Sequence, residues 1–421
     1  MTGEDGQDSK TSSSAEDRGP VISSNPLWPK LGEWLLALWL ASFWFLSWET
    51  LHRVLLDLLI VAFLLRTPRA ELKRLMQARW LWLAGALLGW QCLSRLWSGG
   101  GVESPGWWLD ALMVGGLLVT LCGTSRKRME DRMIPLMALV AAATSAISLL
   151  VFYLDGAHNL ADDRLRNVFF YTHGLNAVWT GFLMAFGALA GAWLSSQQSG
   201  RSRQLSWIGI TAVSMFGLLA TQSRGPILMF AAGFFVLLVF ERKRVLPVIA
   251  AGAGVVIVYA LLILAHPWRD AASDMIERGS TGRFDIYRWY LTDMSNRDYL
   301  IGTGMASSLV VPEGAFDWEV VHPHCIYLTQ LYQTGVPGLL LLVSLIAWGL
   351  TSAFGLARKG MSVWLCLLFG ASVALLFDGS QAFSVYSGTR VEVLLILVPL
   401  AISLAGGKGK GGTLTAKPGV S

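Results

Sequence analysis

Two histidines lie two positions apart late in the chain, in the stretch HPHCIYLTQLYQT, which runs from His322 to Thr334. The chain has only six histidines, and this pair stands between an acidic stretch with proline and glycine and a long apolar run. An imidazole can take up a hydroxyl proton near neutral pH, so one of the two is a candidate general base. A structural histidine at a helix start is the alternative.

Five arginines form a second group of candidates. Arg224 is the clearest, because it stands between two apolar runs in LLATQSRGPILMFAAG, where a charge at bilayer depth costs about 2.5 to 3.5 kcal/mol. A guanidinium kept there is expected to meet an anion, and it binds phosphate through two parallel hydrogen bonds. Snorkelling to the interface, or pairing with a carboxylate, would also satisfy it. The other four are Arg164, Arg166, Arg283 and Arg288.

The stretch RFDIYRWYLTD combines arginine with aromatic residues along a predicted helix. Arg283 and Tyr287 are four residues apart and therefore share one face of that helix. Arginine and aromatic side chains together suit a phosphate joined to sugars, because aromatic rings cover the apolar faces of sugars. Arg288, Trp289 and Tyr290 belong to the same stretch. An amphipathic helix on the membrane surface would have the same composition, so both interpretations stay open.

Two other stretches resemble catalytic motifs only in part. TQSRG, around Ser223, lacks the first glycine and the preceding strand of a nucleophile elbow, so we expect no nucleophile there. GTGMAS lacks the lysine and the βαβ context of a phosphate-binding loop, so we expect a turn. The candidate chemistry therefore rests on the histidine pair and the arginines.

A membrane scaffold must position these side chains. The chain is 54% hydrophobic and 14% charged, with a mean hydropathy of +0.52, which indicates an integral membrane protein. Apolar runs long enough to span a bilayer, about 17 to 25 residues each, recur along the chain. Lipid offers the backbone no hydrogen-bond partners, so every N–H and C=O group must be paired within the protein. Such runs therefore form helices. The predicted fold class is therefore an all-α integral membrane protein, and the four cysteines show no disulfide or metal framework.

We predict about twelve transmembrane helices. Basic connections recur on one side of them, and the positive-inside rule makes that side the cytoplasm; the connections are RTPRAELKRLMQAR, SRKRMEDR, GRSRQ, ERKR and ARKG. The net charge of +5 thus sets topology and does not indicate nucleic-acid binding. The predicted helices are 32–48, 51–65, 79–97, 106–123, 133–154, 173–194, 205–221, 225–240, 245–265, 325–354, 361–377 and 390–405.

The domain organisation follows from these helices. A polytopic membrane domain covers residues 31–405, and its largest outer connection is a periplasmic segment, residues 266–324, between the ninth and tenth helices. Polar or basic flexible tails, residues 1–30 and 406–421, are expected on the cytoplasmic side. The arginine and histidine candidates then lie on the periplasmic side.

The arginine and histidine stretches together resemble the O-antigen ligase family, which is related to O-antigen polymerases and protein O-oligosaccharyltransferases. The family shows an arginine followed after three residues by leucine at the outer end of a helix, and Arg224-Gly-Pro-Ile-Leu228 fits this pattern. It also shows a histidine, then Asn, Ser or Gln, then nine residues, and then Gly-x-x followed by Gly, Thr or Tyr.

The spacing of the second motif distinguishes the two histidines. Counting from His324 gives Cys325, nine residues, Gly335 and Gly338. Counting from His322 would put a glutamine at the first glycine position. The register therefore selects His324, and Cys325 departs from the amide or hydroxyl residue that is usual in the family.

The resemblance implies a GT-C-like membrane glycosyltransferase of lipopolysaccharide biosynthesis in the bacterial inner membrane. Its donor would be a glycan on undecaprenyl pyrophosphate, its acceptor a sugar hydroxyl of the lipid A core, and it would need neither ATP nor a metal cofactor. His324 would be the base. The pyrophosphate would be bound by Arg224, Arg283, Arg166, Arg288 and Arg164.

Related functions stay open at this point. An O-antigen polymerase would extend another lipid-linked repeat, and a protein O-oligosaccharyltransferase would modify a protein. A polyprenyl-glycan transporter would use the outer arginines as a substrate pathway, but it should then show matching features on both sides of the membrane. The histidine spacing favours a ligase.

Overall fold

The computed structural model describes residues 27–45, 49–98, 106–154, 163–170, 177–242, 244–264, 282–312, 314–316, 319–381, 383 and 390–405. Within these residues the chain forms helices and no strands, which confirms the predicted all-α class. Each of the twelve predicted apolar runs coincides with helix in the described residues, with ends displaced by a few residues. Residues 1–26 of the first predicted tail, the whole second tail and residues 266–281 of the predicted periplasmic segment lie outside the described residues. Residues 27–30, predicted as tail, belong to the first helix.

The helices follow one another in the order α1 to α17, with short 3₁₀ segments at Phe43–Phe45, Arg95–Trp97 and Val168–Phe170. Two π-helical turns, Met129–Met133 and Val393–Leu397, join α6 to α7 and lead into α17. The bounds are α1 Leu27–Ser42, α2 Glu49–Arg66, α3 Arg69–Met76, α4 Arg79–Ser94, α5 Gly106–Gly123, α6 Arg126–Arg128, α7 Ile134–Leu154, α8 Ala177–Gln197, α9 Arg201–Ala220, α10 Arg224–Glu241, α11 Leu246–Leu264, α13 Arg283–Asp293, α14 Asn296–Ile301, α15 Ile326–Ala357, α16 Val363–Ala374 and α17 Val398–Ala405.

Four helical segments of the described chain are long and apolar enough to cross a membrane by themselves. They are Arg126–Leu154, Ala177–Gln197, Arg224–Glu241 and Ile326–Ala357. Several shorter apolar helices accompany them, including Trp108–Gly123, Leu246–Leu262, Val363–Ala374 and Val393–Ala405. The protein is thus a multi-helix membrane protein, and the count of twelve spans stays a prediction.

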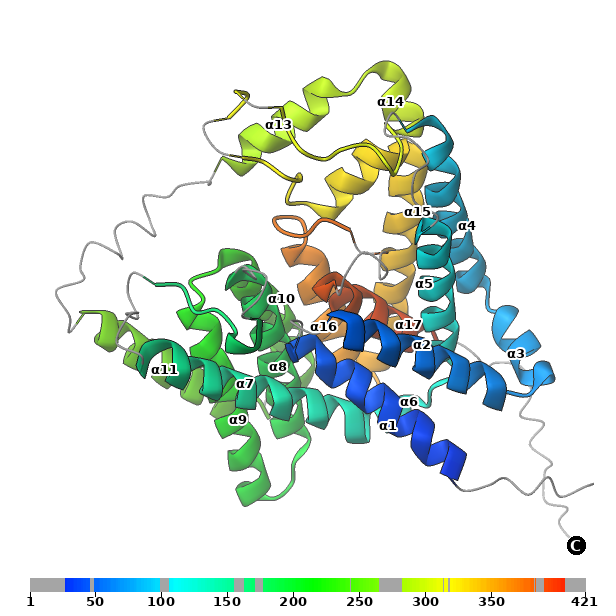
Figure 1. The fold of residues 1–421 in the computed structure, drawn as a ribbon. Helices are drawn as coiled ribbons and strands as arrows, with labels where there is room; N and C mark the ends of the chain where they lie inside the picture. The colour runs from blue at the N-terminus through cyan, green and yellow to red at the C-terminus, as the bar shows by residue number, and fades with distance from the viewer. Residues whose placement is uncertain are drawn as a thin grey trace, which may run out of the picture.

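Helix α8 forms the centre of one half of the molecule. Its apolar window is 94% buried, and it packs against α7, α9, α10 and α16 (Figure 1). Small residues allow this close packing: a Cβ atom on Gly187 would lie 2.1 Å from the Cβ of Ala141, and one on Gly191 would lie 2.6 Å from the Thr211 hydroxyl. Such small-residue contacts are how helices approach one another inside a bilayer.

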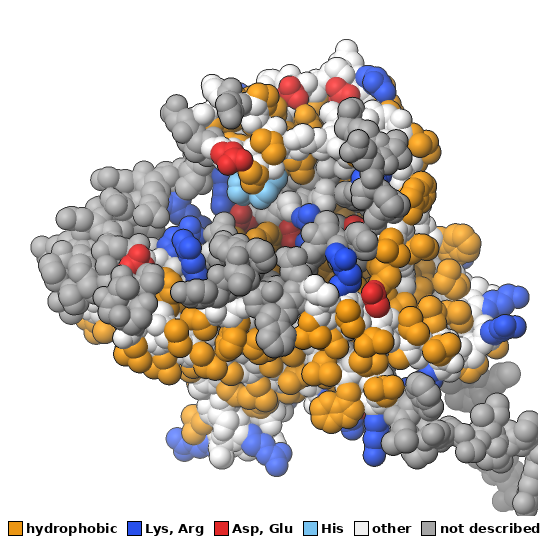
Figure 2. All heavy atoms as spheres, viewed as in Figure 1, with side chains coloured by type: hydrophobic (Ala, Val, Ile, Leu, Met, Phe, Trp, Pro, Cys, Tyr) orange, Lys and Arg blue, Asp and Glu red, His pale blue; other side chains and the backbone are white. Residues whose placement is uncertain are grey.

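The surface separates hydrophobic from charged side chains. Figure 2 shows hydrophobic side chains in a broad band across the middle, with Lys and Arg side chains below it and at its edge, and others above it. Helices α13 and α14 stand at the opposite end, above this band (Figure 1). Histidine side chains are visible there, in a hollow beside acidic and basic ones (Figure 2). The side of the membrane on which each end lies stays a prediction.

Helix α15 is interrupted at Gly335, the first glycine of the histidine motif. Gly335 has φ 67° and ψ −172°, and Pro337 follows it. A Cβ atom at this position would lie 2.6 Å from the Leu300 carbonyl oxygen, so the end of α14 approaches the break backbone to backbone. Glycine is required here both for its positive φ and for this close approach. A short outer segment, residues 326–334, therefore precedes the long apolar one.

Other segments supply hydrogen bonds to the carbonyl groups that the break releases. The backbone N–H groups of Thr303 and Gly304 donate to the carbonyls of Tyr332 and Gln333 at 2.8 and 2.9 Å. The indole of Trp90 donates to the Thr334 carbonyl at 2.8 Å. The turn predicted for GTGMAS is thus present, and it serves as the partner of the broken helix. Irregular backbone in a membrane protein is tolerated where protein groups satisfy it in this way.

Candidate active site

His324 stands just before α15, at the left-handed backbone conformation φ 55°. The helix begins at Ile326, with Cys325 as its N-cap residue, one residue after the predicted start at position 325. A positive φ is uncommon outside glycine and often marks a functional position. The side chain is 29% exposed, whereas its Nδ1 atom is fully buried. The exposed surface of the ring therefore belongs to atoms other than Nδ1.

Asp378, just beyond the end of α16, joins two of the predicted site residues. Its Oδ1 atom lies 3.5 Å from Nδ1 of His324, and its Oδ2 atom accepts a hydrogen bond of 3.0 Å from Nη2 of Arg283. The His324 contact is longer than an ordinary hydrogen bond, but such contacts often tighten only when substrate binds. Because the Asp378 side chain is only 7% exposed, its charge needs these partners.

The start of α10 completes this cluster. A Cβ atom on Gly225 would lie 2.9 Å from Oδ2 of Asp378, so the helix approaches the carboxylate with no side chain between them. The positive end of the helix dipole thus favours the negative charge of Asp378. Arg224 is the neighbouring residue, exposed at the first position of the helix. The structure therefore brings Arg283, His324 and the backbone at the start of α10 around one carboxylate, with Arg224 directly before Gly225 in the chain.

Arg164 holds the turn that leads into α10. Its Nε donates to the carbonyl of Thr221 at 3.1 Å, and its Nη2 donates to the hydroxyl of Ser223 at 2.8 Å. Ser223 is buried and its own hydroxyl bonds back to Thr221, which agrees with the prediction that it is not a nucleophile. The preceding residue, Gln222, has φ 51°. Arg164 thus binds the turn that immediately precedes Arg224 in the chain.

The remaining two predicted arginines are exposed. Arg166 lies two residues after Arg164 in a stretch without regular secondary structure, and the next residue, Asn167, anchors that stretch through a 3.0 Å hydrogen bond from its backbone N–H to the Thr180 hydroxyl. Arg288 lies on α13 five residues after Arg283, hence on a different face of the helix from it. Arg166 thus belongs to the same segment as Arg164. Arg288 lies outside the Asp378 cluster.

His322 lies against His324, with ring centroids 4.1 Å apart. Its Nδ1 atom accepts the backbone N–H of His324 at 3.0 Å. Burial, and to a smaller extent the charge of the neighbouring His324, lower the pKa of His322 to about 4. The side chain is therefore neutral near pH 7, as an acceptor must be. The left-handed backbone conformation at His324 thus brings the two imidazoles together.

The aromatic residues of α13 have two different roles. Tyr287 shares the face of Arg283 as predicted, and its hydroxyl donates to the Leu376 carbonyl at 2.8 Å, next to Asp378. Tyr290 is fully buried and its hydroxyl bonds to the carbonyl of Leu309, so it belongs to a core and cannot cover a sugar. Phe284, by contrast, is 64% exposed.

Sequence reasoning missed Asp378, Arg390 and Glu392. Glu392 is buried and accepts the backbone N–H of Ser380 at 3.0 Å, and Arg390 donates to the Ser380 hydroxyl at 2.6 Å. These bonds fix the loop that carries Asp378. A signal was present, because ionisable residues at the end of an apolar run are costly to keep. The argument that singled out the outer arginines applies equally to Arg390.

Residues 209–343 match the family model described as O-antigen ligase. The chain carries an O-antigen ligase domain. This match confirms the resemblance drawn from the two motifs, and it contains Arg224, Arg283, Arg288 and His324. Arg164, Arg166 and Asp378 lie outside the matched residues. No curated protein matches the chain.

The match to this family model indicates a multi-pass membrane enzyme that acts on glycans, with polyprenyl-linked glycan and lipid substrates in general. The structure also shows the environment of Cys325, which stands where the family motif has Asn, Ser or Gln. The residue has the extended conformation of an N-cap, but its thiol makes no capping hydrogen bond, and it packs into a cluster with Tyr332 and Leu328. An Asn or Ser at this position would be a capping residue.

Proposed function

We propose that the protein transfers an O-antigen glycan from undecaprenyl pyrophosphate to a sugar hydroxyl of the lipid A core, at the periplasmic face of the bacterial inner membrane. The observation that carries the proposal is the Arg283–Asp378–His324 cluster at the start of α10. It supplies a base and an anion-binding group within one site, and the family match supports a glycan substrate.

His324 takes the role of general base. Asp378 faces its Nδ1 atom, which favours the tautomer that carries its proton on that nitrogen. The other nitrogen, Nε2, is then free to accept the proton of the acceptor hydroxyl. As that proton leaves, the hydroxyl oxygen bonds to the anomeric carbon and the bond from this carbon to the pyrophosphate oxygen breaks. Asp378 stabilises the imidazolium that forms, and direct attack from the opposite face inverts the configuration.

The leaving group is an anion, so the protein must mainly hold its charge. Arg283 uses one nitrogen for Asp378 and makes no other hydrogen bond to a described residue, which leaves the rest of its guanidinium for a phosphate. Arg224 stands exposed at the start of α10, where free backbone N–H groups also favour an anion. Arg164 supports the turn before Arg224, and Arg166 and Arg288 are the outer candidates for contacts with the donor.

The proposed orientation places this site on the periplasmic side and both termini in the cytoplasm. Leu300→Cys on α14 and Arg358→Cys after α15 test it, because both positions are exposed and lie on opposite predicted sides. A membrane-impermeant maleimide added to intact spheroplasts should label the first and not the second. Labelling of both from one side would overturn the orientation.

The deciding experiment is reconstitution. Purified full-length protein, lipid-linked O-antigen glycan and lipopolysaccharide that lacks O-antigen are incubated without ATP or added metal. A lipopolysaccharide ladder on a gel is the expected result. Extension of the glycan on its polyprenyl carrier would mean a polymerase, and glycosylation of an added acceptor protein would mean an oligosaccharyltransferase. Movement of donor across a vesicle membrane without a covalent product would mean a transporter.

A further inference from the structure

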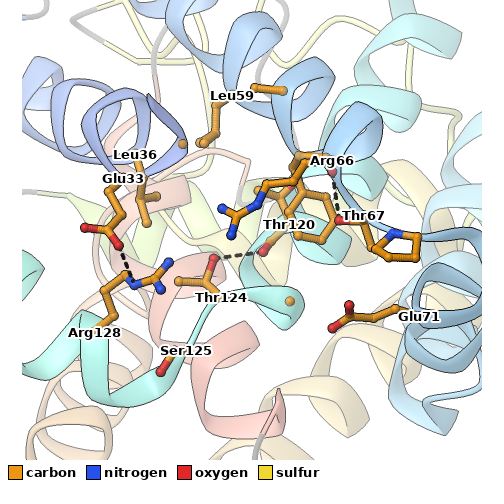
Figure 3. Close-up of a pocket in the computed structure, with 15 residues that line it drawn as sticks. Glu33, Leu36, Leu59, Arg66, Thr67, Glu71, Thr120, Thr124, Ser125 and Arg128 are labelled. Atoms are coloured by element: carbon orange, nitrogen blue, oxygen red, sulfur yellow. Dashed lines mark hydrogen bonds and ion pairs between the residues drawn. The ribbon is translucent and has the colours of Figure 1, made fainter. Parts of the chain in front are cut away.

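A cavity of about 330 Å³ lies far from the His324 cluster, between the ends of α1, α2, α3 and α5. Its lining includes Gly32 and Glu33 of α1, Arg66 at the end of α2, and the two short turns Thr67–Pro68 and Thr124–Ser125. Figure 3 shows the Arg66 guanidinium pointing into it, toward Thr124 and the Glu33–Arg128 pair. Nothing in the proposed glycan transfer uses this space.

The cavity has an apolar part and a polar part. Leu36, Leu59, Ala62 and Phe63 line it on the side of α1 and α2, and the first two are each only 3% exposed. The same two helices expose further apolar side chains outward, such as Trp34 at 67% and Leu65 at 77%. A ligand here would therefore meet a charged group and a hydrocarbon surface together, which is the chemistry of a lipid.

The polar part carries excess positive charge. Glu33 is shared by two arginines: it lies 3.0 Å from Nε of Arg128 and also pairs with Arg132, so this group keeps one positive charge. Arg66 adds a second, because no hydrogen bond or ion pair joins it to another described residue. Thr67 and Thr124 donate to carbonyls of their own helices and compete little for the guanidinium. Glu71 also lines the cavity, and it pairs with Arg74 at 4.0 Å. Both carboxylates of the lining thus have arginine partners, and the cavity favours an anion.

The location identifies the source of that anion. The cavity lies between RTPRAELKRLMQAR and SRKRMEDR, two of the five basic connections that the positive-inside rule places in the cytoplasm. Basic pockets between helices on that side suit anionic headgroups. We infer that the cavity binds the phosphate of an anionic phospholipid of the inner leaflet, with Arg66 on the phosphate and α1 and α2 along an acyl chain. A space of this size holds a headgroup and not a polyprenyl-linked glycan.

The test uses purified full-length protein in detergent. Native mass spectrometry measures retention of added dioleoylphosphatidylglycerol, dioleoylphosphatidylcholine serves as the zwitterionic comparison, and inorganic phosphate serves as the soluble anion. The wild-type protein should retain phosphatidylglycerol in preference to the other two. Arg66→Gln should weaken that retention about tenfold or more, since a hydrogen bond to a charged group is worth about 1.5 to 3 kcal/mol.

Arg69→Gln is the matched control. Arg69 is an exposed arginine of the same basic connection and does not line the cavity, so its loss should leave retention unchanged. Gly32→Leu provides a second variant that keeps every charge: a Cβ atom on Gly32 lies 4.0 Å from Arg66 Nη1, so a leucine would fill the space and block the lipid.

Each other outcome overturns the proposal. Wild-type-like retention in both Arg66→Gln and Gly32→Leu would show that the cavity is not the site. Equal losses in Arg66→Gln and Arg69→Gln would mean attraction to the basic surface as a whole. Equal retention of phosphatidylcholine would mean that the charge is not recognised, and displacement of the lipid by inorganic phosphate would point to a soluble ligand.

Discussion

The carboxylate of Asp378 lies 3.5 Å from the buried Nδ1 atom of His324, although 54 residues of chain separate the two. Helices α15 and α16 hold them together: the backbone N–H of Ile326, at the start of α15, donates to the carbonyl of Leu375, just after α16, at 3.1 Å. The relationship gives the base an orienting partner, which a lone histidine at a helix start would lack.

Asp378→Asn should lower the rate of glycan transfer on the order of 10²-fold, because the amide cannot stabilise an imidazolium. Binding of lipid-linked donor, measured separately, should persist, since the arginines remain. Asp293→Asn, at a carboxylate that accepts only the Tyr332 hydroxyl bond on the outer side, is the control and should transfer glycan normally. Equal activity of the two variants would remove Asp378 from the mechanism.

His324→Ala should abolish transfer, with a loss of about 10²- to 10⁴-fold, as expected for removal of a general base. The protein should still insert and bind donor. His322→Ala should cost less than about tenfold, because it loses one hydrogen bond worth about 1 kcal/mol. Both are compared by complementation of a ligase-deficient strain, with the lipopolysaccharide ladder read beside the expression level. A reversed order of effects would refute the assignment of the base.

His322→Asn tests the contact between the histidines through its pH dependence. The folded protein keeps His322 neutral down to about pH 4, whereas an unfolded histidine takes up its proton near pH ~6.5. The unfolded state therefore binds more protons between these values, and stability falls as the pH is lowered through this window. Asparagine can accept the His324 N–H without titrating. Its thermal midpoint should fall less than that of the wild type between pH 6.5 and 4, and parallel curves would contradict this role.

Arg224→Lys should lose most of the activity while it keeps the charge, because lysine cannot form the planar two-pronged contact with phosphate. The measurement is donor binding and transfer rate in the reconstituted reaction. Arg297→Lys, at an exposed arginine of α14, is the matched control and should have no effect. Wild-type behaviour of Arg224→Lys would mean that only charge matters at this position.

Gly335→Ala should prevent correct folding. Alanine is disfavoured at φ 67°, and its Cβ atom would clash with the backbone of Leu300 and Ile301. We expect a large loss of monodisperse protein in size-exclusion chromatography. Gly355→Ala in the same helix, where a Cβ atom would meet nothing within 4 Å, should purify normally. Normal yield of both would show that the break tolerates a side chain.

The sequence predicted the helices well, because apolar runs of spanning length have few alternatives in lipid. The register of the glycine motif also selects His324 over His322 as the candidate base, and this choice stays a prediction. The sequence could not predict the contact between the two imidazoles, which depends on a left-handed residue at position 324. Asp378 was missed for a related reason: its importance arises from the packing of α16 against α15, and nothing in its own stretch of sequence records that contact.

The break at Gly335 also explains why the number of residues after His324 matters. The outer segment of α15, residues 326–334, is a rigid spacer between a fixed backbone junction at α14 and the N-cap that carries the histidine. One inserted residue would turn the far end of this spacer by about 100° and lengthen it by about 1.5 Å. The imidazole would then face away from Asp378. The nine residues of the motif thus fix both the direction in which the His324 imidazole faces and its distance from the junction at α14.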